Sequence, residues 1–64
     1  MKVGDLVRVK HGYTWRYNRE WSAKRQAVLV TGMYRHERDP EAQFNIRVDN
    51  DWYPSKYFEV VSAA

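Results

Sequence analysis

The clearest pattern in this chain is a strict alternation of apolar and polar residues over Gln43 to Val48. The apolar members are Phe44, Ile46 and Val48, and the residues between them are polar. A period of two places successive side chains on opposite faces of a strand, so this segment predicts a strand with one buried face. A sheet that covers a core on one side only has this pattern.

Other segments predict further strands and very little helix. The polar cluster at 49–51 favours a tight hairpin, and Pro54, which has no backbone donor, favours a 3₁₀ turn over residues 54–57. No segment sustains a helical period. We expect strands at Leu6 to Lys10, at Ala27 to Tyr34 with a break at Gly32, at Gln43 to Val48, at Trp52 to Tyr53 and at Phe58 to Val61, with a frayed tail at 62–64.

The length of the chain limits its core. Its 64 residues make one domain, 1–64, and a chain this short buries only about 60% of the surface that it exposes when unfolded. There are no cysteines, so large apolar side chains must supply the stability that disulfides supply elsewhere. We expect the interior to hold Val7, Val9, Val28, Val30, Phe44, Ile46, Val48, Phe58 and Val60.

The charge is modest in total but unevenly placed. The net charge is +3. Residues 1–25 contain seven Lys and Arg against two acids, a net +5, whereas residues 26–64 contain four against six, a net −2. A basic part joined to a mildly acidic part indicates an anionic partner more strongly than the total does, although a solvated basic face would give the same count.

Basic and aromatic side chains are interleaved in the long connection that follows the first strand. Cations attract a phosphate backbone and flat rings stack on exposed bases, so this mixture is typical of a nucleic-acid surface. If the segment is extended, the residues at spacing two from Tyr13 to Trp21 share one face. The candidate binding residues are Lys10, Tyr13, Trp15, Arg16, Tyr17, Arg19, Trp21, Lys24 and Arg25.

Two other interpretations of this connection stay open. Any one of its rings can fold back and plug an end of the core, with arginine side chains stacked on it. Trp, Tyr and Arg are also the side chains that dominate protein–protein hot spots. A protein partner is therefore the alternative to nucleic acid.

Catalytic and metal chemistry have little support. His11 and His36 are far apart, have no cysteine partners and match no ligand spacing. Ser22, Ser55 and Thr31 lack a recognisable nucleophile context, and the chain has no glycine-rich phosphate cradle. We expect no catalytic residues, no metal, no cofactor and no small-molecule substrate.

The chain also lacks membrane and export signals. No apolar run approaches the ~20 residues of a membrane span, and the start Met-Lys-Val-Gly has no hydrophobic signal region. We expect a cytoplasmic protein without a membrane partner, and a monomer by default.

The two ends of the chain resemble a known family. The opening Lys2 to Val9 and the closing Tyr53 to Val61 look like the first strand, 3₁₀ turn and last strand of an SH3-like small barrel, including KOW-type modules and short phage-encoded barrels that begin Met-Lys-Val-Gly-Asp. In SH3 domains the region of Trp52, Pro54 and Tyr57 borders the ligand groove, so the resemblance implies a second possible surface there. The favoured interpretation of these residues is that they close the core, because small domains depend on aromatic side chains. The basic first loop departs from the acidic loop of domains that capture proline-rich peptides.

Together these observations predict an all-β fold, a small SH3-like barrel of about five strands with a long basic-aromatic first loop and one 3₁₀ turn. This barrel serves many functions, so the resemblance alone does not assign one. We expect a non-catalytic binding module whose partner is nucleic acid, DNA or RNA. The alternative is a protein–protein interaction module, for example a phage protein that docks on a host enzyme or polymerase.

Overall fold

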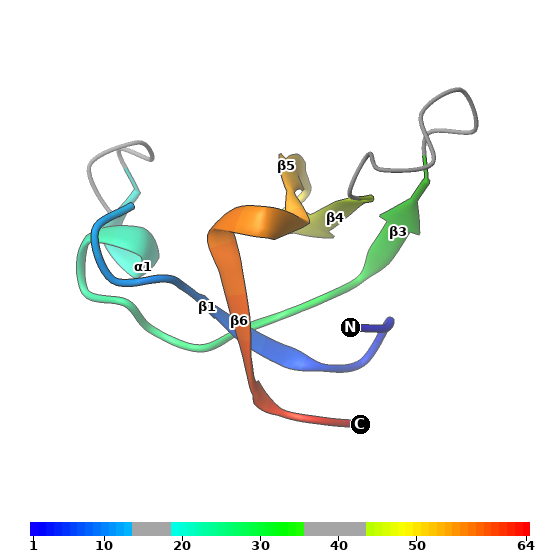
Figure 1. Cartoon of the computed structure of the whole chain (residues 1–64), viewed down its shortest axis with the longest axis horizontal. Helices are drawn as coiled ribbons and strands as arrows, with labels where there is room; N and C mark the ends of the chain where they lie inside the picture. The colour runs from blue at the N-terminus through cyan, green and yellow to red at the C-terminus, as the bar shows by residue number, and fades with distance from the viewer. Residues whose placement is uncertain (14–18, 36–43) are drawn as a thin grey trace.

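Short strands are the main regular elements of the described part of the chain. The computed structural model describes residues 1–13, 19–35 and 44–64 (Figure 1). The elements of the described part are β1 (Leu6–Val9), α1 (Glu20–Ala23), β2 (Val28–Leu29), β3 (Gly32–Tyr34), β4 (Asn45–Val48), β5 (Asp51–Pro54), the 3₁₀ turn η2 (Ser55–Tyr57) and β6 (Phe58–Ser62). The described residues contain no helix with the length and apolar character that a membrane span requires.

The strands of residues 1–13, 19–35 and 44–64 form two antiparallel sheets of three strands each. One sheet has the order β2-β1-β6 and the other has the order β3-β4-β5. In Figure 1, β6 crosses β1 below the second sheet, and the two termini lie on the same side of the molecule. The prediction of an all-β protein is confirmed. In the segments that the structure describes, neither sheet closes on itself, so the SH3-like barrel stays a prediction.

The predicted single strand over residues 27–34 contributes to both sheets. Val28 and Leu29 pair with β1, whereas Gly32 to Tyr34 pair with β4. The chain passes from one sheet to the other at Val30 and Thr31, whose amides donate to the carbonyls of Asp5 and Arg47 at 2.9 Å and 2.8 Å. The predicted break at Gly32 was therefore wrong by one or two residues, and the split gives six strands among the described residues.

The hairpin predicted at 49–51 is present between β4 and β5. Val48 pairs with Asp51, so Asp49 and Asn50 are the two turn residues, with φ angles of 51° and 64°. Positive φ at both central positions defines a type I′ turn, in which Asn and Asp are tolerated better than most residues. The 3₁₀ turn predicted after this hairpin is also confirmed.

The core lies between the two sheets. Its fully buried apolar residues are Val7, Val9, Val30, Ile46, Val48 and Phe58. All six belong to the predicted interior. Val28 and Phe44 are only partly buried, and the assignment of Val60 to the core was wrong, because its side chain is 43% exposed. Val60 lies on the edge strand β6, next to a bulge where the pairing with β1 shifts register.

Two loop predictions need correction. Residues 20–23 of the predicted first loop form the short helix α1, so an extended arm does not run through Trp21. The predicted frayed tail is held at its end, because the amide of Ala64 donates to Asp5 Oδ1 at 2.7 Å. Asp5 is buried and also accepts from the amide of Lys2 at 2.9 Å.

Candidate nucleic-acid interface

The structure describes six of the nine predicted binding residues. Trp15, Arg16 and Tyr17 lie outside the described residues, and so does most of the extended face predicted for them. The remaining six separate into two groups. Four of them, Arg19, Trp21, Lys24 and Arg25, pack on the core or pair with acceptors of the protein. Lys10 and Tyr13 lie at a turn next to the 3₁₀ turn, and Tyr13 also packs against the core.

Trp21 contributes to the fold. It is partly buried and packs against the core, with its ring 5.6 Å from the ring of Tyr53 and 6.1 Å from that of Phe58. Its Nε1 donates to Asp49 Oδ2 at 3.4 Å. The interpretation of a ring that folds back on the core therefore describes Trp21 better than the interpretation of an exposed stacking platform.

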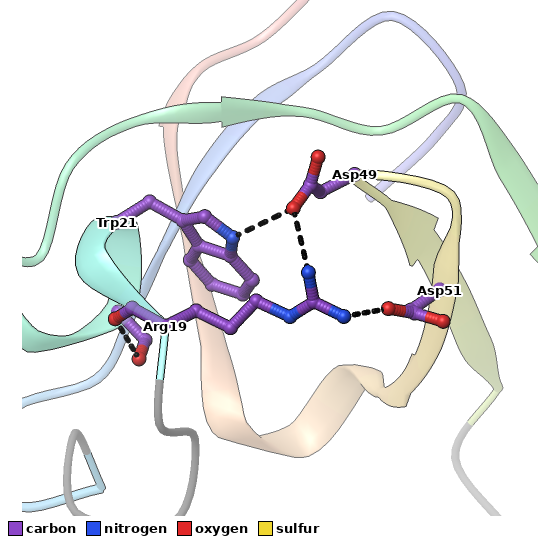
Figure 2. Close-up of polar contacts among 5 residues, drawn as sticks. Arg19, Trp21, Asp49 and Asp51 are labelled. Carbon is purple, nitrogen blue, oxygen red and sulfur yellow. Dashed lines mark hydrogen bonds and ion pairs between the residues drawn. The ribbon is translucent and has the colours of Figure 1, made fainter.

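Arg19 spans from the start of α1 to the β4–β5 hairpin. Figure 2 shows its guanidinium between two carboxylates: Nη1 pairs with Asp49 Oδ2 at 3.2 Å, and Nη2 pairs with Asp51. The neighbouring Tyr53 and then Asp51 raise the pKa of Arg19, so its charge is secure. These pairs are about half exposed, and exposed pairs contribute little to stability because solvent screens them. Phosphate can compete for such an arginine.

Lys24 and Arg25 are also paired within the protein. Lys24 Nζ lies 2.8 Å from Glu20 Oε1, one turn earlier on α1. Arg25 donates from Nε to the Val9 carbonyl at 3.1 Å and from Nη2 to Glu59 Oε1 at 2.8 Å. Of the two, Arg25 is the more firmly fixed, because it has both a backbone and a carboxylate acceptor.

Glu59 pairs with two arginines, Arg8 and Arg25. Arg8 Nε on β1 lies 2.7 Å from the same Oε1 that Arg25 contacts. The hydrogen bond from Arg8, with the charges of Arg8 and Arg25, lowers the pKa of Glu59. Part of the basic character predicted for the first loop is thus compensated inside the molecule.

Lys10 and Tyr13 have a different environment. The amide of Tyr13 donates to the Lys10 carbonyl at 3.1 Å, which closes a turn after β1. Gly12 within this turn has a φ of 93°, a conformation in which any other residue is strained. The turn places Tyr13 against Tyr57, with ring centroids 4.9 Å apart.

The 3₁₀ turn supplies a second lysine to this place. The Tyr57 carbonyl accepts from the Lys10 amide at 2.8 Å, and Lys56 Nζ lies 5.1 Å from the centre of the Tyr57 ring. Neither lysine forms an ion pair with a carboxylate of the described residues. We call Lys10, Tyr13, Lys56 and Tyr57 the tyrosine–lysine cluster. The sequence prediction omitted Lys56, since nothing local shows that residues 10–13 and 56–57 meet.

The described residues hold no group of three or more His, Asp or Glu side chains arranged to bind a metal ion. No protein-family model matches the sequence, and neither curated proteins nor solved structures match this chain. The chemistry of the cluster itself is therefore the guide to its role: within the described part of the chain, two cations without carboxylate partners lie beside a pair of aromatic rings.

Proposed function

We propose that this chain is a non-catalytic SH3-like barrel that binds nucleic acid, with the tyrosine–lysine cluster as the centre of its contact surface. The barrel is supported by the strand order. One bent segment, β2 followed by β3, serves both sheets, and a 3₁₀ turn precedes the last strand, which returns to pair with the first.

The observation that carries the function is the uncompensated charge at the cluster. Arg8, Arg19, Lys24 and Arg25 each have a carboxylate partner, whereas Lys10 and Lys56 have none among the described residues. A lysine without an acidic neighbour gains the full benefit of a phosphate contact, because no intramolecular pair has to be broken first. The adjoining rings of Tyr13 and Tyr57 pack against the core but are only partly buried, so their accessible parts can contact sugars and bases.

The salt dependence of binding tests this proposal. Affinity for fluorescein-labelled DNA and RNA oligonucleotides is measured by anisotropy at two salt concentrations. Log affinity should fall linearly with log salt. The slope of this line should be about −0.7 to −0.9 for each phosphate that a cation neutralises. Failure to bind any oligonucleotide at low salt would overturn the proposed function.

Charge-removing variants locate the surface. Lys10→Gln and Lys56→Gln should each weaken binding and flatten the salt slope by about 0.7 to 0.9 units. Lys2→Gln is the matched control, because it removes the same charge from the chain before β1, whereas Lys10 directly follows this strand. Equal effects of all three variants would indicate a diffuse electrostatic attraction and not a contact at the cluster.

A protein partner is the second candidate, and a separate observation favours it. The strands of the β2-β1-β6 sheet and the segment before β1 carry exposed aliphatic side chains, and two of them, Leu6 and Leu29, pair across β1 and β2. The exposed residues of this group are Val3, Leu6, Leu29, Val60 and Val61. Aliphatic contacts release no counterions, so binding to such a partner should depend only weakly on salt and survive nuclease treatment.

A further inference from the structure

The outward face of the β3-β4-β5 sheet carries aromatic and basic side chains. Ile46 and Val48 of β4 point into the core, so Arg47 between them faces outward. The strand register places two rows of residues on this side. One row is Gly32, Arg47 and Trp52, and the other is Tyr34, Asn45 and Pro54.

Trp52 reaches across this face. It is 50% exposed, and its ring extends from β5 over β4 towards Gly32 on β3. A Cβ placed on Gly32 would lie only 3.2 Å from Trp52 Cη2. The absence of a side chain at Gly32 therefore lets the indole lie close to the sheet while half of it stays in contact with solvent.

Arg47 is fixed beside this ring. Its Nε donates to Thr31 Oγ1 at 3.1 Å, its Nη2 donates to the Thr31 carbonyl at 3.2 Å, and its Cζ lies 5.9 Å from the centre of the Trp52 ring. A guanidinium has more N–H donors than these two bonds use. Arg47 has no carboxylate partner among the described residues, so its remaining donors suit an incoming anion.

A second exposed ring lies in the adjoining row. Tyr34 is 55% exposed and pairs with Asn45, two residues before Arg47. The only acidic residue of β3, β4 and β5 is Asp51; it pairs with Val48 on the inward side and contacts Arg19. We call Tyr34, Arg47 and Trp52 the outer aromatic face.

We propose that the outer aromatic face binds single-stranded nucleic acid, by stacking unpaired bases on Trp52 and Tyr34 while Arg47 contacts the backbone. This inference rests on the proposed function and names its substrate class. Half-exposed rings beside a fixed cation, with no carboxylate on the same side of these strands, complement a phosphate chain with free bases. A duplex does not fit equally well, because its bases are already stacked on one another.

The test compares Trp52→Ala with the unchanged protein. Binding is measured with labelled single strands of about 12 nucleotides, a length within the range that one small binding domain covers, and with the corresponding duplex. Loss of a stacking ring should weaken single-strand binding about five- to 150-fold and leave the salt slope unchanged. Duplex affinity should change much less. Tyr34→Ala should act in the same direction.

Three controls separate stacking from folding and from general apolar contact. Trp52→Phe keeps an aromatic face and should retain most of the affinity. Leu29→Ala removes an equally exposed apolar side chain from the other sheet and should leave binding unchanged. Melting temperatures of all variants show whether any loss of affinity comes from unfolding, and Tyr34→Ala keeps the proposal testable if Trp52→Ala does not fold.

The outcomes distinguish the two proposals. If the protein binds oligonucleotides but folded Trp52→Ala and Tyr34→Ala bind normally, the outer aromatic face is not the stacking surface and the proposed function stands. If duplexes and single strands lose affinity equally, the assignment of the substrate class is wrong. If no oligonucleotide binds and a protein partner loses affinity on Trp52→Ala, both proposals fail and the face belongs to a protein interface.

Discussion

At the scale of single residues, side chains of similar chemistry differ in how deeply they are buried. Ile46 and Val60 were both expected in the core, yet Ile46 is fully buried and Val60 is 43% exposed. Ile46 lies on the central strand of its sheet, whereas Val60 lies on the edge strand β6 beside a bulge. Whether an apolar side chain is buried therefore depends also on its position in the sheet.

This contrast gives a stability prediction. Ile46→Ala should lower the free energy of unfolding by about 2 to 5 kcal/mol, because it removes buried contacts and leaves a cavity. Val60→Ala should cost less than about 1 kcal/mol, since much of that side chain is already in water. Chemical denaturation of the two variants checks the difference. A larger loss at Val60 would mean that another surface covers it.

At the scale of elements, the β4–β5 hairpin is the clearest agreement between pattern and structure. The alternation before the hairpin and its polar turn residues are both local signals, and together they predict the hairpin that the structure contains. The short helix α1 had no such signal. Its four residues are too few to show a period, and it is held in place by Trp21, which packs on the core, and by Arg19, which pairs with the hairpin.

The turn itself can be tested at Asn50. Asn50 is exposed and has a φ of 64°, so substitutions there act mainly through the backbone. Asn50→Val should destabilise the protein by about 1 to 2 kcal/mol, because a β-branched residue resists the left-handed conformation. Asn50→Gly should maintain or raise stability. Thermal melting of the pair measures this, with Asn50→Asp as the control that stays near the original value.

At the scale of the whole molecule, the uneven charge of the sequence becomes internal complementarity. Arginines of the basic part, Arg8, Arg19 and Arg25, pair with carboxylates of the acidic part, at Asp49, Asp51 and Glu59. The charge asymmetry therefore has a structural role that the residue counts alone do not reveal. The cations without such partners are the informative ones for binding.

These carboxylates predict how stability depends on pH. The amide of Ala64, and then that of Lys2, lowers the pKa of Asp5, and Arg8 lowers that of Glu59. A carboxyl whose pKa is lower in the folded state stabilises the protein above its unfolded pKa, 3.8 for Asp5 and 4.5 for Glu59. That stabilisation is lost as the pH falls through the lower, folded values.

We therefore expect a melting temperature that is maintained near neutral pH and falls below a pH of about 4.5. Asp5→Asn should reduce stability at neutral pH and make the decline in acid shallower, because one of the titrating groups is gone. Melting curves recorded from pH 7 to pH 2 test this. An Asp5→Asn variant with the same acid dependence as the original would assign the decline to other groups.

The sequence by itself determined the local features of this protein. The alternation over 43–48, the polar hairpin turn and the proline before the 3₁₀ turn each act over a few residues, and the structure contains all three elements. Six of the nine predicted core residues are fully buried for the same reason. Periodicity within one strand is enough to say which of its faces is apolar.

Only the tertiary structure decided which residues make the candidate site. Lys10 meets Tyr57, and Arg47 lies between Gly32 and Trp52, because distant strands pair in one particular register. It also decided that Trp21 packs inside and that Arg19 and Arg25 face carboxylates. Apart from Arg47 and Trp52 on the two strands of one hairpin, these contacts join residues 15 to 47 positions apart. Their energy depends on partners that no local pattern specifies.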